Sequence, residues 1–450
     1  MGGLRGKLQP RLAQRVLLRQ PLLAQTGAVN VSFSAGLRSS RQGSLLMRWF
    51  LAATVGPVVL VAACAGGDDD EAVGPTGSRG PSGSLTATAP ATLPPVQSPC
   101  PVPDLSIYRV EIDTGKVSTL GQGENPKLSQ DGSLLSYLSL AEQPNCVPTM
   151  FVDSVISGQH LFSKEGVYTA SEWSPTEAAL ALGANGNQPS EVTIISISED
   201  EASTNTIFRG LVNDISWSGD GSRIAFIDGE TGDISVYGLE YGTTRKLPSL
   251  PISERSVVVQ AEWSPRDELL AVWTYEPQPS GPNVSRLFLV SPIDGSSNEV
   301  LDPPGGSLPS WSPDGSFLSF NVSEGGTSSE YMVAIDGPSS SRSFPGANGI
   351  WAPDGTILAY VDDCETWDIS VVAPDGTGDH VLAPAAPDQV QLPWSWSPDS
   401  SLLAYSDKQH TYAVTRDGQV TQLPPHMRKV TWSPDGRYLI GTKVAGHGLC

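Results

Sequence analysis

The chain of 450 residues is short of charge, and above all of positive charge. Charged residues make up 17% of it, with 27 Lys and Arg against 48 Asp and Glu, so the formal net charge is −21. A surface that acidic repels phosphate backbones, which proteins bind through Lys and Arg. The composition therefore excludes nucleic-acid binding.

Long helices are also disfavoured. Gly (46) and Pro (38) are numerous and Trp (11) is generously represented, whereas charged helix formers are scarce. Gly and Pro interrupt helices and occupy turns. The composition predicts a mostly β protein with many tight connections and argues against a helical bundle.

The sequence also lacks a run of apolar residues long enough to cross a membrane as a helix. The longest apolar stretch, residues 49–63, follows Arg48 and is interrupted by Gly56 and Pro57. It falls short of the ~20 residues that span a bilayer as a helix, but it has the form of a signal peptide. Its end, Val61-Ala-Ala-Cys64, resembles the bacterial lipobox, which implies acylation of Cys64 and cleavage before it. An ordinary secretory signal with a chance Cys is the alternative.

The residues after Cys64 favour a lipid anchor. They are rich in Gly, Asp, Ser, Thr and Pro and contain almost no large apolar side chain, so they predict a flexible tether. Met47 with Arg48 would by itself open a compact signal, which makes residues 1–46 a candidate mis-assigned start. We expect three parts: a signal region at 1–63, a tether at 64–103 and a folded domain at 104–450.

One short motif recurs eight times. It reads Trp-Ser-Pro-Asp-Gly in its full form, at Trp311 and Trp432, and is degenerate at Leu128. Successive copies start 36 to 48 residues apart. A period of ~40–45 residues is typical of the four-stranded blades of a β-propeller.

The motif's chemistry explains its repetition. Pro presets φ, Asp bonds its own backbone and Gly adopts a left-handed conformation, so the motif predicts a turn between two antiparallel strands. We expect the Trp that opens each copy to be buried between blades rather than to bind a ligand. These packing residues are Trp173, Trp217, Trp263, Trp311, Trp351, Trp396 and Trp432.

A second hairpin follows each motif but the last, and one at residues 107–120 precedes the first. We call the two strands of the motif hairpin A and B, and those of the second hairpin C and D. The eight A–B hairpins and the eight C–D hairpins form complete four-stranded blades only if the N-terminal hairpin completes the C-terminal blade. This closure pairs the two chain ends within one blade, so neither half-blade is left with an open edge of its own. We therefore predict an all-β propeller of eight blades with two-plus-two closure, with seven blades as the alternative if the unit at Leu128 is irregular.

The repeat resembles that of the TolB-like, WD40-like family of bacterial β-propellers. The resemblance covers about residues 104–445 and implies the propeller fold and export. TolB proteins carry an additional N-terminal α/β domain, and related peptidases append a hydrolase domain; neither is evident here. The Gly-x-Ser-x-Gly nucleophile motif is absent from the sequence.

The remaining cysteines are Cys100, Cys146, Cys364 and Cys450. An even set in an exported chain indicates disulfides, with three possible connectivities. In the predicted topology, Cys100 and Cys450 lie in the two halves of one B–C loop of the closing blade. We expect a bond between them, which would constrain nearly the whole unfolded chain; Cys146, in the neighbouring blade, is the competitor.

Three of the five histidines, His410, His426 and His447, lie in or beside loops expected on one rim of the last two blades. Three imidazoles on one rim can ligate a transition metal, and some enzymes with this propeller, such as oligogalacturonate lyases, use a His-bound metal. No carboxylate or Gln partner stands at a fixed spacing, so exposed loop histidines are the competing interpretation. His160 and His380 are expected to begin outer strands.

The sequence contains no evident catalytic set. We therefore interpret the chain as a monomeric, non-enzymatic scaffold without a cofactor. It would be lipid-anchored in the bacterial cell envelope, facing the periplasm or the exterior, touch the membrane only through its lipid, and bind an envelope protein or a glycan. The alternative is a metal-dependent lyase or hydrolase on the histidine rim. A small-molecule or peptide sensor using the central channel is a third hypothesis, with no specific residues to support it.

Overall fold

The computed structural model of the protein describes residues 105–140, 147–185, 190–198, 201–266, 269–280, 283–301, 309–324, 327–335, 341–362, 366–384, 391–407 and 409–444. These residues form thirty-two strands and no helix. Within them there is accordingly no helix with the length and apolar character needed to cross a membrane.

The strands are named in chain order. The first sixteen are β1 (Leu105–Glu111), β2 (Val117–Gln122), β3 (Glu124–Leu128), β4 (Leu134–Leu140), β5 (Pro148–Ser154), β6 (His160–Glu165), β7 (Val167–Trp173), β8 (Ala179–Asn185), β9 (Glu191–Ser198), β10 (Glu201–Arg209), β11 (Val212–Trp217), β12 (Arg223–Asp228), β13 (Ile234–Gly238), β14 (Thr243–Lys246), β15 (Val257–Trp263) and β16 (Leu270–Glu276). The others are β17 (Val284–Val290), β18 (Ser297–Leu301), β19 (Ser310–Trp311), β20 (Phe317–Glu324), β21 (Thr327–Ala334), β22 (Ser341–Pro345), β23 (Ala347–Trp351), β24 (Leu358–Val361), β25 (Ile369–Val372), β26 (His380–Ala383), β27 (Gln391–Trp396), β28 (Leu402–Ser406), β29 (Thr411–Thr415), β30 (Val420–Leu423), β31 (Arg428–Trp432) and β32 (Tyr438–Val444).

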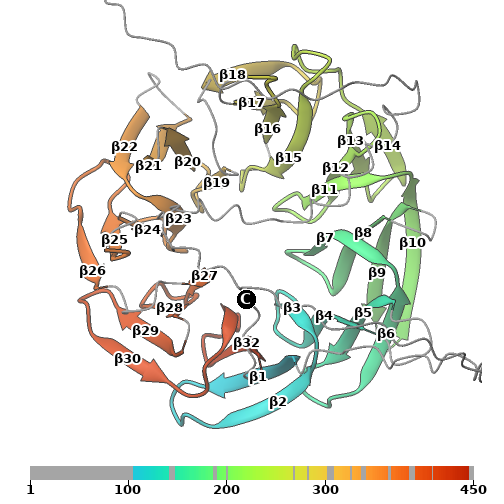
Figure 1. The fold of residues 1–450 in the computed structure, drawn as a ribbon. Helices are drawn as coiled ribbons and strands as arrows, with labels where there is room; N and C mark the ends of the chain where they lie inside the picture. The colour runs from blue at the N-terminus through green and yellow to red at the C-terminus, as the bar shows by residue number, and fades with distance from the viewer. Residues whose placement is uncertain are drawn as a thin grey trace, which may run out of the picture. The chain divides into compact units, whose positions relative to one another are not determined.

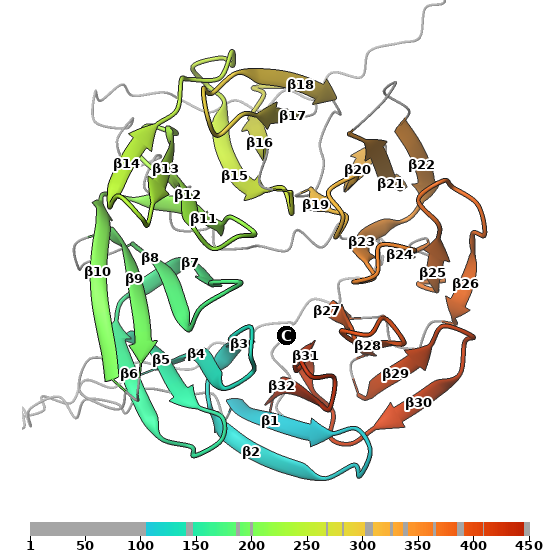
Figure 2. The same cartoon turned by 180° about the vertical axis from the view of Figure 1, so that it is seen from behind.

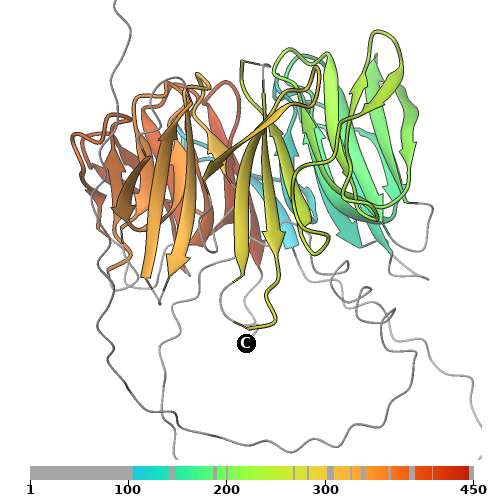
Figure 3. The same cartoon turned by 90° about the horizontal axis from the view of Figure 1, so that it is seen from above.

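The strands pair into eight antiparallel sheets of four, arranged as a ring (Figure 1). Blade 1 consists of strands β3–β6. Each following set of four consecutive strands forms the next blade, up to blade 7, which consists of β27–β30. The first strand of each blade lies nearest the centre of the ring and the fourth lies at its outer edge (Figures 1 and 2). The side view shows the strands running from one face of the ring to the other, so the connections gather on two faces (Figure 3).

Blade 8 closes the ring with both ends of the domain. Its strand order is β2-β1-β32-β31, and all seven residues of β1 pair with β32, from Leu105 with Val444 to Glu111 with Tyr438. The predicted eight blades and two-plus-two closure are therefore confirmed. The unit at Leu128 forms a regular four-stranded blade, which removes the seven-bladed alternative.

The motif turn is held by its Ser and Asp together. In blade 5, Ser312 Oγ accepts the main-chain N–H of Phe317 at 2.9 Å and donates to Asp314 Oδ1 at 2.6 Å. Asp314 in turn accepts the N–H of Ser316 at 3.0 Å, and Gly315 has a φ of 67°. The same Ser and Asp contacts recur at Ser218, Ser397 and Ser433. These hydrogen bonds fix a short turn without help from the rest of the ring.

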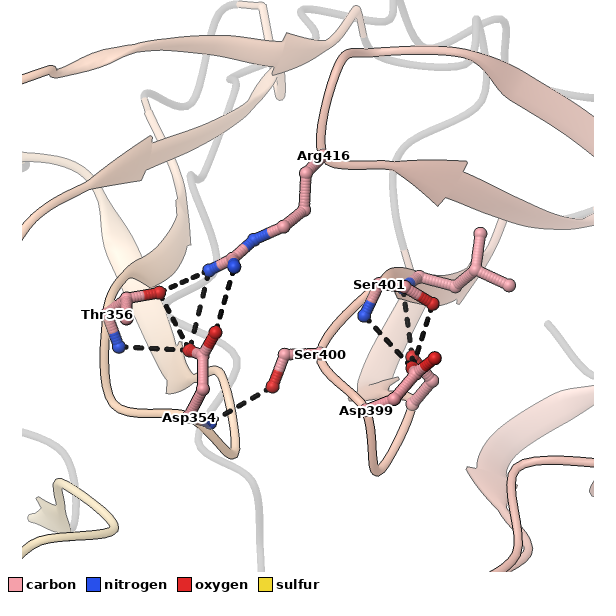
Figure 4. A network of polar contacts seen from close by, with 8 residues as sticks. Asp354, Thr356, Asp399, Ser400, Ser401 and Arg416 are labelled. Atoms are coloured by element: carbon pink, nitrogen blue, oxygen red, sulfur yellow. Dashed lines mark hydrogen bonds and ion pairs between the residues drawn. The ribbon is translucent and has the colours of Figure 1, made fainter.

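Neighbouring motif turns also bind one another. Arg416, in the turn between β29 and β30 of blade 7, pairs with Asp354 in the motif turn of blade 6, with Nη1 2.8 Å from Oδ2 (Figure 4). Ser400, from the motif turn of blade 7, accepts the main-chain N–H of Asp354 at 3.0 Å. Arg266, in the motif turn of blade 4, donates from Nε to the main-chain carbonyl oxygen of Asp314 in the motif turn of blade 5 at 2.7 Å.

The motif tryptophans lie between blades, and their exposed fractions range from 4% for Trp217 to 9% for Trp173. Each belongs to a core cluster with residues of its own and the preceding blade; Trp263, for example, packs with Ala225 and Val236 of blade 3. Burying side chains of this size between every pair of sheets contributes much of the hydrophobic stabilisation of the ring.

A β-bulge recurs in the innermost strands. The pairing register shifts at a corresponding place in β3, β7, β11, β15, β23, β27 and β31. In blades 1, 6 and 8 the bulge contains a residue with positive φ, namely Asn125, Asn348 and Lys429. Bulges re-aim side chains and increase twist, so they set the direction of the side chains at the ring centre.

Candidate functional site

Each blade carries one corresponding residue on its innermost strand, next to the motif. This residue directly precedes the motif on the innermost strand, and we call the set the pre-motif residues. They are Lys127, Glu172, Ser216, Glu262, Ser310, Ile350, Ser395 and Thr431. Seven of the eight are polar, so the innermost strands carry hydrogen-bonding groups next to the buried motif tryptophans.

The main-chain carbonyls of the pre-motif residues accept hydrogen bonds from the next blade. The indole N–H of Trp217 donates to the carbonyl of Glu172 at 3.0 Å, and that of Trp432 to Ser395 at 2.9 Å. Trp173, Trp311 and Trp396 make the equivalent bond. Nε1 of Trp263 and of Trp351 is buried without a partner among the described residues.

Polar side chains also bridge adjacent innermost strands. Such a strand has a pairing partner on one side only, so main-chain N–H groups on its other side need acceptors from elsewhere. Glu172 Oε2 accepts the N–H of Trp217 at 3.1 Å, and Asp214 Oδ2 accepts that of Ala261 at 3.0 Å. Blades 2, 3 and 4 are therefore linked at the ring centre through carboxylates.

Three acidic groups and one lysine interact here: Glu172, Asp214, Glu262 and Lys127. We call them the central charge cluster. Burial raises the pKa of Glu172 to about 8 and that of Asp214 to about 7, against the opposing effect of their main-chain hydrogen bonds. Burial, then repulsion from Glu172 and Asp214, raises the pKa of Glu262 to about 8.

Lys127 is the cation of this cluster. Its Nζ donates to the carbonyl of Ser171 at 2.5 Å, and burial lowers its pKa in spite of attraction to Glu172 and Asp214. All four side chains keep some exposed surface, yet the surrounding protein displaces enough water to disfavour their charged forms. The carboxyl groups therefore tend to keep their protons near neutral pH, and an approaching cation would favour the release of these protons.

The opposite half of the ring centre is different. The pre-motif residues of blades 5 to 8 carry no charge. Lys429 on β31 donates to Asn125 Oδ1 on β3 across the junction between the last and the first blade. The acidic groups of the described innermost strands are thus concentrated in blades 2 to 4.

A second polar group lies on the rim of blade 7, around Asp407. Asp407 is buried, with 2% of the residue exposed. Its carboxylate accepts hydrogen bonds from the main-chain N–H groups of Gln409 and His410 and from the hydroxyl of Tyr412. Burial alone would raise the pKa of Asp407, but these hydrogen bonds outweigh it and hold the pKa below its usual value.

Asp407 also brings together two of the predicted rim histidines. His410 Nδ1 lies 3.8 Å from Asp407 Oδ2, and His426 Nε2 donates to the Asp407 carbonyl oxygen at 3.0 Å. The first histidine comes from the β28–β29 loop and the second from the β30–β31 loop. A hydrogen bond to Asp407 therefore orients His426, as outer contacts of metal-bound histidines do, and His410 lies beside the same carboxylate.

The three-histidine metal site stays a prediction. His447 lies outside the described residues, and within them no group of three or more His, Cys, Asp or Glu is placed to hold a metal ion. Cys64, Cys100, Cys146, Cys364 and Cys450 also lie outside the described residues, so the lipidation and disulfide predictions stay open.

The other two histidines begin strands β6 and β26, where the sequence predicted them. His160 Nδ1 lies 2.8 Å from Asp153 Oδ1, and His380 Nδ1 donates to the carbonyl of Gly378 at 2.6 Å. Both residues are exposed.

Sequence reasoning missed Asp407 and the central charge cluster. A signal for the second existed, because Lys127, Glu172 and Glu262 each directly precede a motif copy. Side chains alternate between the two faces of a strand, so a residue beside a motif Trp that packs on the preceding blade points toward the following blade, as Glu172 does. Asp407 gave no such signal, since its position is distinguished only by the loop that it organises.

Comparison with known proteins adds to this description of the fold. No protein-family model matches the chain, and no curated protein matches it either. Among solved structures it is similar to dipeptidyl peptidase 4 of Porphyromonas gingivalis, at 13% identity and a TM-score of 0.53, over 72% of this chain and 57% of that one. It is also similar to oligogalacturonate lyase of Vibrio parahaemolyticus, at 13% identity and a TM-score of 0.48, over 76% and 98% of the two chains. TolB of Acinetobacter baumannii matches at 14% identity and a TM-score of 0.37, over 70% and 80%.

At these identities the similarity shows the fold alone. The chain is an eight-bladed β-propeller, the fold that the repeat motif implied, and TolB proteins are among the propellers that it is similar to. Its activity has to be argued from its own residues.

Proposed function

We propose that the chain is a lipid-anchored, non-enzymatic binding scaffold of the bacterial cell envelope, and that its partner presents a positively charged segment to the ring. The observation that carries the proposal is the central charge cluster: three carboxyl groups on adjacent innermost strands with a single lysine. A bound Lys or Arg side chain would favour the ionised form of these groups, so that binding releases a proton and pairs the cation with a carboxylate. An envelope protein with a basic segment fits better than a neutral glycan.

The anchor is the second part of the proposal. The lipobox-like end at Cys64, followed by the tether at 64–103, would hold the propeller at 104–450 close to a membrane surface without a spanning segment. Multiple acyl chains give the stable attachment that one chain cannot. Metabolic labelling with palmitate tests this: the wild type is labelled, and a Cys64→Ala variant is not.

Partner binding is tested by capture from intact envelopes with the acylated protein, followed by titration of the captured partner. We expect Glu262→Gln to weaken binding and high salt to weaken it further. Glu240→Gln is the matched control, because Glu240 is an exposed glutamate in the β13–β14 turn, away from the innermost strands. Equal affinity of the two variants would remove the central charge cluster from the proposal.

A metal-dependent lyase or hydrolase is the second candidate. It is favoured by the two histidines that lie beside Asp407 on the rim, one of them hydrogen-bonded to it. Metal analysis of the purified protein separates the candidates: the scaffold is expected to contain no stoichiometric metal. A stoichiometric transition metal that is lost in both His410→Ala and His426→Ala would support the enzyme instead.

A further inference from the structure

A cleft lies where the closing blade meets blade 1, away from the ring centre. Its volume is about 260 Å³, and it is lined by β1 and β2 of blade 8 and by the β5–β6 connection of blade 1. These elements lie side by side in Figures 1 and 2. Leu120 and Ile156 contribute apolar surface, and Ser118, Thr119, Ser154 and Ser157 contribute hydroxyl groups.

Arg109 supplies the positive charge of the cleft. Its guanidinium carbon lies 4.1 Å from the centre of the Tyr438 ring, and its one ion pair among the described residues is a long contact of 3.8 Å with Glu111. Its Nε is buried and has no partner. None of the described side chains accepts a hydrogen bond from this guanidinium, although the group carries five N–H donors. An arginine oriented by an aromatic ring and lacking acceptors is arranged to receive an anionic group.

Asp153 supplies the negative charge, from blade 1. Its Oδ2 accepts the hydroxyl of Tyr137 at 2.6 Å, and its Oδ1 lies 2.8 Å from His160 Nδ1. These contacts fix the carboxylate and leave lone pairs on both oxygens for further donors. Arg109 and Asp153 line the same cleft from different blades, yet no ion pair joins them.

Arg109 and Asp153 are not paired with each other, so together they determine which charged groups an occupant of the cleft must carry. A dianion would meet Asp153 as well as Arg109, and a simple cation would leave the guanidinium without an acceptor. A ligand with a carboxylate at one end and an ammonium at the other satisfies both walls, and a short apolar body matches Leu120 and Ile156. We propose that this cleft binds a zwitterionic amino acid or short peptide, with its carboxylate on Arg109 and its amino group on Asp153.

Titration calorimetry on the full chain tests the proposal with three probes of one skeleton: L-valine, isovalerate, which lacks the amine, and isobutylamine, which lacks the carboxylate. L-valyl-L-valine tests the length of the occupant. We expect L-valine or its dipeptide to bind, and each singly charged analogue to bind at least about tenfold more weakly, since each leaves one charged wall unpaired. No binding of either zwitterion, or equal binding of isovalerate, would overturn it.

Variants locate the site. Arg109→Gln should weaken zwitterion binding by about tenfold or more, whereas Arg437→Gln should leave it unchanged. Arg437 is the matched control because its side chain is 81% exposed and it does not line the cleft. Ser157→Tyr, which places a large side chain at the cleft without changing charge, should abolish binding while the unfolding midpoint stays the same. Wild-type affinity in Arg109→Gln or in Ser157→Tyr would show that the ligand binds elsewhere.

Discussion

Trp432, on the innermost strand of the closing blade, donates its indole N–H to the main-chain carbonyl of Ser395 in the preceding blade at 2.9 Å. Five of the seven motif tryptophans make this bond, and in each the acceptor is the residue directly before the preceding motif copy. The motif Trp therefore both fills the space between blades and anchors itself to the strand that carries the candidate site.

A pair of matched substitutions measures this bond. Trp432 and Trp351 are each 6% exposed, but Nε1 of Trp351 has no partner. Both Trp→Phe changes lose similar volume, and only Trp432→Phe also leaves a buried carbonyl without its donor. We expect Trp432→Phe to reduce the free energy of unfolding by about 1 kcal/mol more than Trp351→Phe, measured by urea denaturation. Equal losses would mean that the indole bond adds nothing to packing.

The raised pKa values at the ring centre predict a pH dependence of stability. Glu262 has a pKa of about 8 in the folded chain and an ordinary value of 4.5 otherwise. Between these values the folded protein holds a proton that the unfolded chain releases, so the free energy of unfolding falls as pH rises through this window. Glu172, Asp214 and the buried Glu330 act in the same direction.

Thermal unfolding between pH 5 and pH 8 measures the effect. Glu262→Gln should remain as stable as the wild type or more so at pH 8, and should reduce the fall in stability across the window by about 1–2 kcal/mol. Glu240→Gln, in an exposed turn, should follow the wild-type profile. Identical profiles for all three proteins would show that the central carboxyl groups titrate normally.

The motif turn of blade 7 offers a test of backbone strain against hydrogen bonding. Ser400 has a φ of 61° at the position that Gly occupies in other copies, and its Oγ accepts the N–H of Asp354 (Figure 4). Ser400→Gly removes the strain and the bond together, so we expect a change in unfolding free energy within about 0.5 kcal/mol. Ser400→Ala keeps the strain and loses the bond, and should cost about 1 kcal/mol. The comparison fails if Ala is tolerated as well as Gly.

The features that the sequence predicted are those set by local chemistry. A Pro-Asp-Gly turn and the apolar strand after it specify one hairpin, and eight copies at blade spacing specify the ring and its closure. The contact between Glu172 and Trp217 depends instead on the pitch between blades and on a bulge in β7, neither of which leaves a pattern in neighbouring residues. Asp407 is similar: it joins His410 to His426 only because the β30–β31 loop returns to the same rim.

The closing blade provides the last test, because its two halves come from opposite ends of the domain. Ile107 on β1 and Ile440 on β32 are both fully buried and belong to one core cluster with Leu135 of blade 1. If β1 is as firmly held as β32, Ile107→Ala and Ile440→Ala should each reduce the free energy of unfolding by about 2–5 kcal/mol, the usual range for a truncated core side chain. A separate, early unfolding of the N-terminal hairpin would instead make Ile107→Ala nearly silent in the main transition. Urea denaturation followed by Trp fluorescence distinguishes these outcomes, and a silent Ile107→Ala beside a costly Ile440→Ala would show that the ring closes without support from its first hairpin.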